Sequence, residues 1–326
     1  MLVWLDGRTN VKAQPQENFG RELMELFTVG VANYVEPDVY AAARVFTGWN
    51  LATSGTTDGS GNYTFFYNAA QHETAAKTFS FPINARGSNA PNTIPARAAA
   101  DGMQDGIDLI HALAFHPETA KRLARRLWTW FVSETDAVPD AWVTRIANVY
   151  LQNNTSMRAV LRAILTSAEF QDPNHFLTRY SWPPEFVVRA LKEVGYVGFS
   201  VNDALTPLLN MGLQLYEPPN VSGWELGHGW FSSGGSLARM NFASQLATNQ
   251  RVALRDQSRA ASATPESLVN FALDTVSAPP LPAAEYTVLT DYVRAGGLWT
   301  GSDTQLLNKT PGVFHLLVGS AEYQFI

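Results

Sequence analysis

From residue 96 to the end of the chain, apolar side chains recur at the three- and four-residue spacing that is typical of amphipathic helices. A helix places such residues on one face, so the pattern predicts a chain built mainly from packed helices. Within 117–132, for instance, Leu123 and Leu127 share a face with either Trp130 or Phe131. The helices expected in this part of the chain cover residues 103–116, 117–132, 140–152, 156–167, 184–194, 201–211, 235–249, 265–275, 283–296 and 304–323.

Two more helices are expected nearer the N-terminus. In residues 18–30, the charged side chains Glu22 and Glu25 form a polar row beside an apolar stripe. Residues 36–38 open the second helix, because proline suits the first turn and acidic side chains suit the positive end of a helix, and Gly48 ends it. The apolar stripe of the first helix consists of Phe19, Leu23, Leu26 and Phe27.

A short β-hairpin is expected to interrupt the helices. Aromatic residues and threonine favour a strand at 63–67, and the segment 78–81 offers it a partner. The residues from Leu51 to Asn62 are rich in glycine, serine and threonine and predict an exposed loop. The predicted fold class is therefore mainly α, a multi-helix globular domain with a small inserted β-hairpin around residues 63–81.

The chain is long enough, at 326 residues, to bury a large core. We expect a helical core over residues 1–277, with an inserted hairpin loop at 51–95. A C-terminal helical hairpin over residues 278–326 is expected to pack on the same core. The proline-rich run at 279–282 is the clearest linker between them.

The composition excludes several classes of protein. A net charge of −6 disfavours nucleic acid as a partner, because phosphate binding needs clustered lysine and arginine. The chain has no cysteine, which excludes disulfides, thiolate nucleophiles and cysteine-ligated zinc. No apolar run approaches the ~20 residues that span a bilayer, so no transmembrane segment is expected. The first residues also lack the basic and long apolar regions of a signal peptide.

The first candidate site combines Arg21, Glu22 and Glu25 with Arg44 and Trp49 from the following helix. One interpretation is an arginine–glutamate network that holds two helices together. The other is a pair of carboxylates that divides into a proton donor and a charged partner, as hydrolysis requires. Spacing alone leaves both open.

A second candidate site is the short segment 71–77, which contains His72, Glu73 and Lys77. An imidazole, a carboxylate and an ammonium within six residues supply the groups of acid–base or metal chemistry. The segment lacks the second histidine of a zinc-binding helix, so the metal hypothesis is the weaker one. A surface turn with a local ion pair is the structural alternative.

A third candidate site lies in the glycine- and proline-rich segment 216–230, which contains Asn220, Trp224 and Trp230. Indole rings held on a rigid loop suit sugar rings and other flat apolar surfaces. Tryptophans that fill a core are the structural alternative. The chain has no nucleophile elbow of the G-x-S-x-G type and no glycine-rich phosphate-binding loop.

Two stretches resemble a bacterial family, the domain of unknown function DUF1800. Residues 18–30 resemble its signature N-Y/F-A-R-E-L-M/L-E-L-F-T-L-G. Residues 218–224, together with Trp230 and the pair Arg239 and Phe242, resemble its P-P-N-V-x-G-W, W and R-x-x-F pattern. The resemblance covers nearly the whole chain.

The resemblance implies a mainly α-helical bacterial protein, exported or associated with the cell envelope, without an established activity. The chain begins inside the family's pattern, so we expect it to lack the family's N-terminal portion. In the segment 72–77, the family commonly has Asp and Gly where this chain has Glu73 and Ala75. The longer acid and the missing glycine change the geometry of any site there.

Our functional hypothesis is a hydrolase acting on a carbohydrate-like substrate, a small molecule or a polysaccharide, with Glu22, Glu25, His72 and Glu73 as its acid and base groups. The first alternative is a non-catalytic binding or scaffold module of the bacterial cell envelope. The second is a metal-assisted hydrolase with a divalent ion at His72 and Glu73; no other cofactor is expected. The expected substrate-binding residues are Arg21, Arg44, Trp49, Lys77, Asn220, Trp224 and Trp230.

Overall fold

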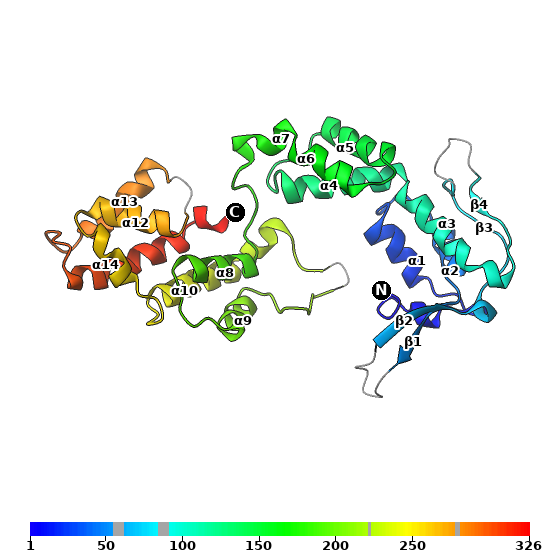
Figure 1. Cartoon of the computed structure of the whole chain (residues 1–326), viewed down its shortest axis with the longest axis horizontal. Helices are drawn as coiled ribbons and strands as arrows, with labels where there is room; N and C mark the ends of the chain where they lie inside the picture. Colours follow the sequence, from blue (N-terminus) through cyan, green and yellow to red (C-terminus); the bar gives the residue numbers. More distant parts are fainter. Residues whose placement is uncertain (55–61, 84–90, 221–222, 278–280) are drawn as a thin grey trace. The chain divides into compact units, whose positions relative to one another are not determined.

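The computed structural model describes residues 1–54, 62–83, 91–220, 223–277 and 281–326 (Figure 1). Helices α1 to α14 dominate these residues, and the strands among them form two small antiparallel sheets of two strands each. The predicted class, mainly α with a small hairpin, is thus confirmed. Within the described ranges, no helix combines the length and the apolar character needed to cross a bilayer.

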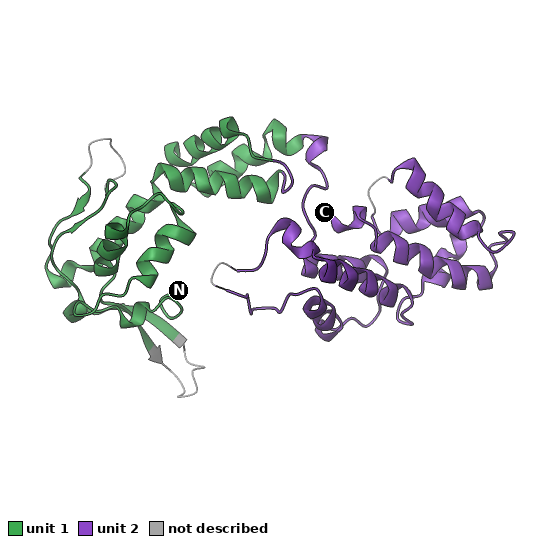
Figure 2. Ribbon diagram, turned by 180° about the vertical axis from the view of Figure 1, so that it is seen from behind, with its two compact units in different colours: residues 1–132, 137–171 green, residues 133–136, 172–326 purple. Residues whose placement is uncertain are grey.

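The chain divides into two compact units (Figure 2). Unit 1 comprises residues 1–132 and 137–171, and unit 2 comprises residues 133–136 and 172–326. The division therefore lies near residue 171, whereas the scheme from the sequence places its boundary at 277–278.

Unit 1 contains two helical groups and the four strands, together with several short helical turns. Its α-helices are α1 (Asn18–Glu22), α2 (Glu36–Val45), α3 (Met103–Ala114), α4 (Pro117–Phe131), α5 (Asp140–Gln152), α6 (Met157–Leu165) and α7 (Ala168–Gln171). Its strands are β1 (Trp49–Ser54), β2 (Asn62–Tyr67), β3 (Lys77–Thr78) and β4 (Thr93–Ile94). Its other turns are the 3-10 helices η1 (Gly7–Thr9), η3 (Ala69–Gln71) and η4 (Ala99–Asp101), and the π-helix η2 (Leu23–Phe27).

All the named secondary-structure elements in the described residues of unit 2 are helices. Its α-helices are α8 (Pro183–Glu193), α9 (Val201–Asn210), α10 (Ser233–Ala247), α11 (Leu254–Gln257), α12 (Pro265–Thr275), α13 (Ala283–Arg294) and α14 (Asp303–Val318). Its 3-10 helices are η5 (Pro173–His175), η6 (Gly227–Phe231), η7 (Ser258–Ala261) and η8 (Glu322–Gln324).

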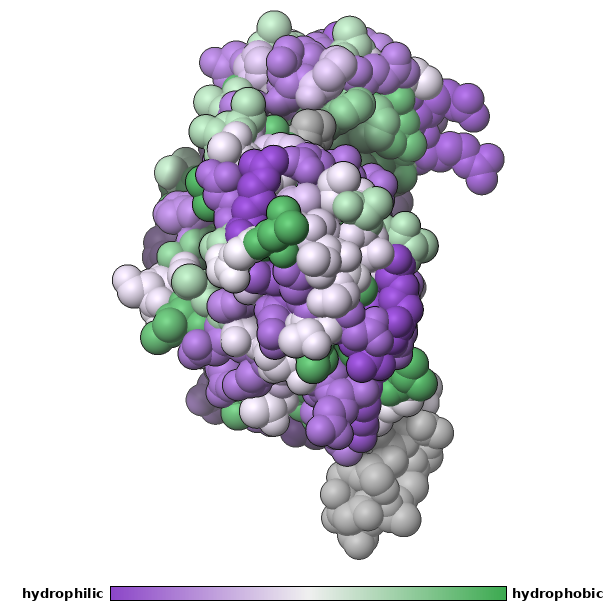
Figure 3. All heavy atoms as spheres, turned by 90° about the vertical axis from the view of Figure 1, so that its left-hand side faces the viewer, coloured by the Kyte–Doolittle hydropathy of each residue, from purple (hydrophilic) through white to green (hydrophobic). Residues whose placement is uncertain are grey.

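Each unit has its own apolar interior. In unit 1, one core joins α1, α2 and α3, and a second joins α4, α5 and α6. In unit 2, a single core draws on α8 to α14. On the face shown in Figure 3, hydrophilic side chains predominate and hydrophobic ones are scattered among them. This is the distribution expected for a protein whose apolar residues mostly fill its cores.

The helix predicted at residues 18–30 changes its winding after Glu22, where α1 continues as the π-helix η2. A π-turn is wider than an α-turn, so it rotates the residues that follow. As a result Met24 is fully buried, whereas Phe27 is 53% exposed. The apolar stripe that regular α-helical spacing predicts, with Phe27 as a member, is therefore not buried along its whole length.

The predicted strand at 63–67 exists as β2, but its predicted partner is wrong. β2 pairs with β1, with Trp49 opposite Tyr67. The segment predicted as a loop from Leu51 thus begins inside a strand. The residues of the predicted partner instead place Phe79 and Phe81 in the core, at 2% and 5% exposure, because aromatic residues two apart in an extended chain face the same side.

The close approach of α3 to β1 depends on Gly106. A Cβ atom at this position would lie 2.3 Å from Cζ2 of Trp49. Trp49 is itself fixed by edge-to-face contacts with Phe46 and Phe65, at ring-centre distances of 5.1 and 5.2 Å. The indole ring therefore has little freedom to move away.

We expect Gly106→Ala to lower the free energy of unfolding by about 1–3 kcal/mol, because the added methyl group overpacks the contact with Trp49. Urea denaturation followed by circular dichroism measures the change. Gly234→Ala in α10 is the matched control, because a Cβ there meets open space and should stabilise the helix. A Gly106→Ala protein as stable as the parent would contradict the packing described.

Candidate functional site

The two carboxylates of the hydrolase hypothesis lie on successive turns at the start of unit 1. Glu22 ends α1 and Glu25 lies in η2, and both are half-buried. Glu25 accepts a hydrogen bond of 2.5 Å from the Tyr34 hydroxyl. Burial and this carboxylate raise the pKa of Tyr34, so the hydroxyl stays protonated and donates.

Arg21 forms ion pairs with acids other than those predicted. It donates to Glu17, at 3.1 Å, and to Glu36 at the start of α2. The arrangement ties α1 to α2, as the structural interpretation expects of an arginine–glutamate network. The acids that supply it are not Glu22 and Glu25.

Arg44 joins α2 to the segment that contains the predicted imidazole. Its Nε donates to Oε2 of Glu73 at 2.7 Å, and its Nη2 donates to the carbonyl of Ala76 at 3.1 Å. Burial alone would raise the pKa of Glu73, but the Ala75 amide and the Arg44 charge outweigh it and lower the pKa. Arg44 of the first candidate site and Glu73 of the second thus form an ion pair.

His72 and Lys77 lie in the interior of unit 1 beside a carboxylate from α3, Asp105. All three are at most 1% exposed. The Lys77 ammonium donates to Oδ2 of Asp105 at 2.6 Å and to the backbone carbonyl of Glu73 at 2.5 Å. Nε2 of His72 lies 3.3 Å from the same Asp105 oxygen. The segment 71–77 is therefore anchored in the interior by His72 and Lys77, while residues 74–76 between them are exposed.

Both ring nitrogens of His72 have protein partners. Nδ1 lies 2.8 Å from the backbone carbonyl of Thr47, and the Thr47 hydroxyl lies 3.3 Å from the same nitrogen. The Thr47 hydroxyl also accepts a hydrogen bond from the Glu73 amide at 2.9 Å. The imidazole is thus fixed by buried groups on both sides.

Arg97 completes the network from the solvent side. Its Nη1 donates to Oδ1 of Asp105 at 2.8 Å, and its Nη2 donates to Asp108 one turn along α3. Burial alone would raise the pKa of Asp105, but hydrogen bonds and charges from His72 and Lys77 outweigh it and hold the pKa below its usual range. Asp105 is therefore an ionised carboxylate that compensates buried cations.

Asp105, Asp108 and Arg97 were not among the predicted site residues. A signal for Asp105 was present, because it lies four residues before Leu109 and eight before Leu113, on the apolar face of a predicted helix. A charged residue on such a face needs a buried partner. The sequence does not say which partner, because Lys77 lies far from it in the chain.

The described residues contain no group of three or more histidine, aspartate or glutamate side chains placed to hold a metal ion. At the predicted metal position, the carboxylate nearest the His72 ring already binds the Lys77 ammonium.

The tryptophans of the third candidate site belong to unit 2. Trp230, at the end of η6, is 5% exposed, and its ring centre lies 6.1 Å from that of Trp182. Trp224 is half-buried, and Asn220 is exposed. Trp230 thus fills the interior of unit 2, as the structural alternative expects, and does not line an open wall.

The most unusual charged group in unit 2 is Arg239 of α10, which is 1% exposed. Nη1 donates to Oε1 of Gln324 at 3.0 Å, and Nη2 donates to the carbonyl of Ser181 at 2.8 Å. Nε has no hydrogen-bond partner among the described residues. Both partners are neutral, so no described carboxylate compensates this charge. Burial lowers the pKa of Arg239 to about 10, which still leaves it charged at neutral pH.

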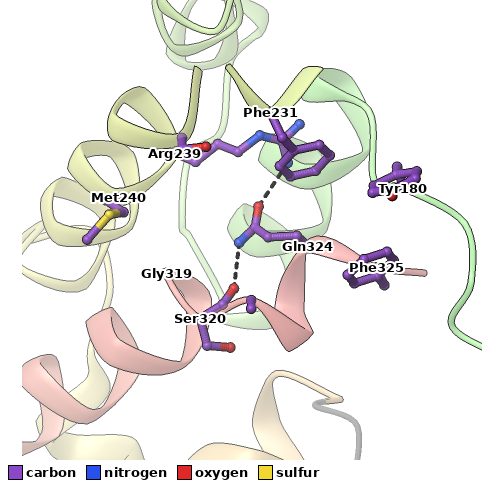
Figure 4. Close-up of a pocket in the computed structure, with 10 residues that line it drawn as sticks. Tyr180, Phe231, Arg239, Met240, Gly319, Ser320, Gln324 and Phe325 are labelled. Atoms are coloured by element: carbon purple, nitrogen blue, oxygen red, sulfur yellow. Dashed lines mark hydrogen bonds between the residues drawn. The ribbon is translucent and has the colours of Figure 1, made fainter. Parts of the chain in front are cut away.

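Arg239 lines a cavity of about 300 Å³. Figure 4 shows its side chain reaching from α10 past the Phe231 ring toward Gln324, with Tyr180 and Phe325 next to each other on the far side. The guanidinium carbon lies 4.4 Å from the centre of the Phe231 ring. The cavity therefore combines one buried cation with three aromatic rings.

The fold and these groups define a mainly helical protein of two compact units, with a buried ion-pair network in one and a cation-lined cavity in the other. The model of the family described as "Protein of unknown function (DUF1800)" matches residues 1–325. The chain therefore belongs to the DUF1800 family, as its resemblance to the family signature predicted. Comparisons with curated proteins and with solved structures gave no match.

We expect Asp105→Asn to lower the free energy of unfolding by about 3–5 kcal/mol, because it leaves the Lys77 and Arg97 cations without their shared carboxylate. Chemical denaturation at neutral pH measures this loss. Asp291→Asn, which removes a surface carboxylate beside Arg294, should have little effect. Equal stability of the two variants would contradict the role assigned to Asp105.

Acid should abolish the advantage of the Asp105 carboxylate. Its pKa is lower in the folded protein than in the unfolded chain, so its contribution is complete above the unfolded value of about 4 and is lost as the pH falls through the folded value. We expect the stability of the parent to approach that of Asp105→Asn below about pH 4. Urea denaturation of both proteins over a pH series measures the difference, and a gap that stays constant would contradict it.

Proposed function

We propose that this protein is a non-catalytic binding module, and that the cavity beside Arg239 holds a small organic anion. The observation that carries the proposal is a buried guanidinium with neutral partners and a free Nε, in the wall of a cavity of about 300 Å³. A buried charge without a counter-charge is costly, so a bound anion would remove an existing penalty.

The lining of the cavity indicates the class of ligand. Most of its surface is apolar, and three aromatic rings contribute to it. The rings of Phe231 and Phe325 both contact Tyr180, at centre distances of 5.3 and 5.0 Å. Aromatic walls favour flat apolar groups. The ligand we propose is therefore a carboxylate carried on a flat apolar body.

The chain supplies the groups that would orient such a ligand. The Gln324 amide already accepts from Arg239 and donates to the Ser320 carbonyl at 2.8 Å, so it holds the guanidinium in place. The Phe186 ring lies against the guanidinium as well, 4.8 Å from its carbon. A fixed cation loses little entropy on binding, which favours affinity for a small ligand.

The carbohydrate hydrolase hypothesis receives less support from the geometry. Glycoside hydrolysis needs an acid and a base that face one substrate. His72 is buried with both ring nitrogens engaged, Glu73 is paired with Arg44, and Glu25 accepts from Tyr34. These engagements favour structural roles, and they support a binding module over an enzyme.

Calorimetric titration with 3-phenylpropionate and its neutral amide tests the proposal. We expect the carboxylate to bind at least about tenfold more tightly, because a hydrogen bond to a charged group contributes ~1.5–3 kcal/mol. Arg239→Met should remove this preference. Equal affinity of the parent for the acid and the amide would refute the assigned role of the guanidinium.

A second variant tests the location without altering Arg239. Ala321 lines the cavity, so Ala321→Trp should fill it and abolish binding of 3-phenylpropionate. Leu237→Trp is the matched control, because Leu237 lies on the exposed side of α10 at 58% exposure. If both variants bind as the parent does, the ligand does not occupy this cavity.

A further inference from the structure

One face of α4 lines a second cavity, of about 520 Å³, in unit 1. The residues on this face recur at three- and four-residue steps from Thr119 to Trp130, as the helical period requires. The adjacent face, with Ala120, Ala124 and Trp128, packs into the core shared with α5 and α6, and Leu123 and Leu127 also contact this core. The face toward the cavity is therefore only partly covered, while the helix itself is held by its core contacts.

Two cations from α4, Arg122 and Arg126, line this cavity, and no carboxylate is among its described lining residues. They lie four residues apart, so they are neighbours on the helix and repel each other. Burial and the charge of Arg126 both lower the pKa of Arg122. Arg126 has no ion pair with any residue in the described ranges. The site therefore carries two positive charges and no internal counter-charge.

Arg122 is positioned by the end of the π-helix. Its Nη1 donates to the Leu26 carbonyl at 2.6 Å, which leaves its remaining N–H groups available. Gly30, with φ of +84°, gives the side chain room, because a Cβ there would lie 3.1 Å from Cδ of Arg122. The glycine that closes the family signature thus permits the arginine to lie here.

Thr119 is the third residue of α4, and this residue lines the same cavity. Its hydroxyl oxygen is buried, with the residue 9% exposed, and has no hydrogen-bond partner within the described part of the chain. Buried hydroxyls are nearly always paired in native proteins. An unpaired hydroxyl beside two arginines points to a missing acceptor.

The remaining wall is apolar. Leu123 and Leu127 are half-buried, and Phe27 and Trp130 are each 53% exposed. Phe27 faces outward because of the π-helix, which rotates it away from the core. Apolar side chains next to a pair of cations favour a ligand with an anionic end and an apolar end.

We propose that this cavity binds a phosphate monoester with an apolar substituent. Its two negative charges match Arg122 and Arg126, and arginine binds phosphate oxygens in pairs. The Thr119 hydroxyl donates to a third oxygen, and the substituent lies against Leu123 and Leu127. The site is separate from the Arg239 cavity, and neither proposal depends on the other.

Phenyl phosphate is the test ligand, titrated calorimetrically into the Ala321→Trp protein, in which the cavity of unit 2 is filled. If phenyl phosphate does not bind, the proposal for the Arg239 cavity is unaffected. If 3-phenylpropionate does not bind at the Arg239 cavity, the proposal for this site is unaffected. We expect phenyl phosphate to bind at least about tenfold more tightly than inorganic phosphate or phenol, because only the ester has both ends. Equal binding of inorganic phosphate would overturn the proposal in favour of a simple anion site.

Variants on α4 identify the residues that bind the ester. Arg126→Gln should weaken binding of phenyl phosphate at least about tenfold, since it removes one charged donor pair. Arg125→Gln is the matched control: it removes the same charge from the same helix, and Arg125 is absent from the cavity lining and 3.9 Å from Asp140. Equal weakening by both variants would show a non-specific charge effect and overturn the site.

Thr119→Val tests the hydroxyl with a side chain of the same shape. We expect weaker binding of phenyl phosphate with unchanged or higher thermal stability, because the change removes an unpaired buried hydroxyl. A purely structural role for this hydroxyl would instead lower the melting temperature and leave the affinity unchanged. That result would remove Thr119 from the site.

Discussion

The ionised carboxylate of Asp105 is the interaction on which the interior of unit 1 depends. It accepts hydrogen bonds from Lys77 and Arg97 and faces the His72 ring, so it joins α3 to one segment that is distant in the sequence, 71–77, and to Arg97 just before the helix. In a buried setting a cation needs such a partner, and a carboxylate needs several donors. Two further contacts hold the same unit together. Gly106 allows α3 to pack against Trp49, and the hydrogen bond from Arg44 to Glu73 connects α2 to the segment 71–77.

Unit 2 also contains a buried charged side chain, but its hydrogen-bond partners are neutral. Arg239 is as deeply buried as His72 and Lys77, but its partners are an amide, a carbonyl and aromatic rings. Compensated charge is expected of a framework, whereas uncompensated charge beside a cavity is expected of a binding site. This contrast is why we propose a structural role for the network around Asp105 and ligand binding beside Arg239.

Much of the fold could be predicted from the sequence, because helical periodicity and terminal signals are local. The helix predicted at 265–275 matches the bounds of α12. The predictions that were wrong are those in which tertiary packing or helix type overrode a local sequence rule. The π-helix leaves Phe27 exposed, although it belongs to the predicted apolar stripe. Phe79 and Phe81 are buried in the core, and β2 pairs with β1 instead of with the segment 78–81. Neither event leaves a local mark in the sequence.

By itself the sequence determined the helical class, the family and the residue types available for chemistry, since each follows from composition, period or motif. Only the tertiary structure decided which charges meet. His72 and Lys77 were visible as candidates, but their burial against Asp105 depends on contacts across about thirty residues. Arg239 was visible only as part of a motif, and its lack of a carboxylate became evident from its surroundings. Compensation of charge is a property of three-dimensional neighbours, which a one-dimensional pattern does not specify.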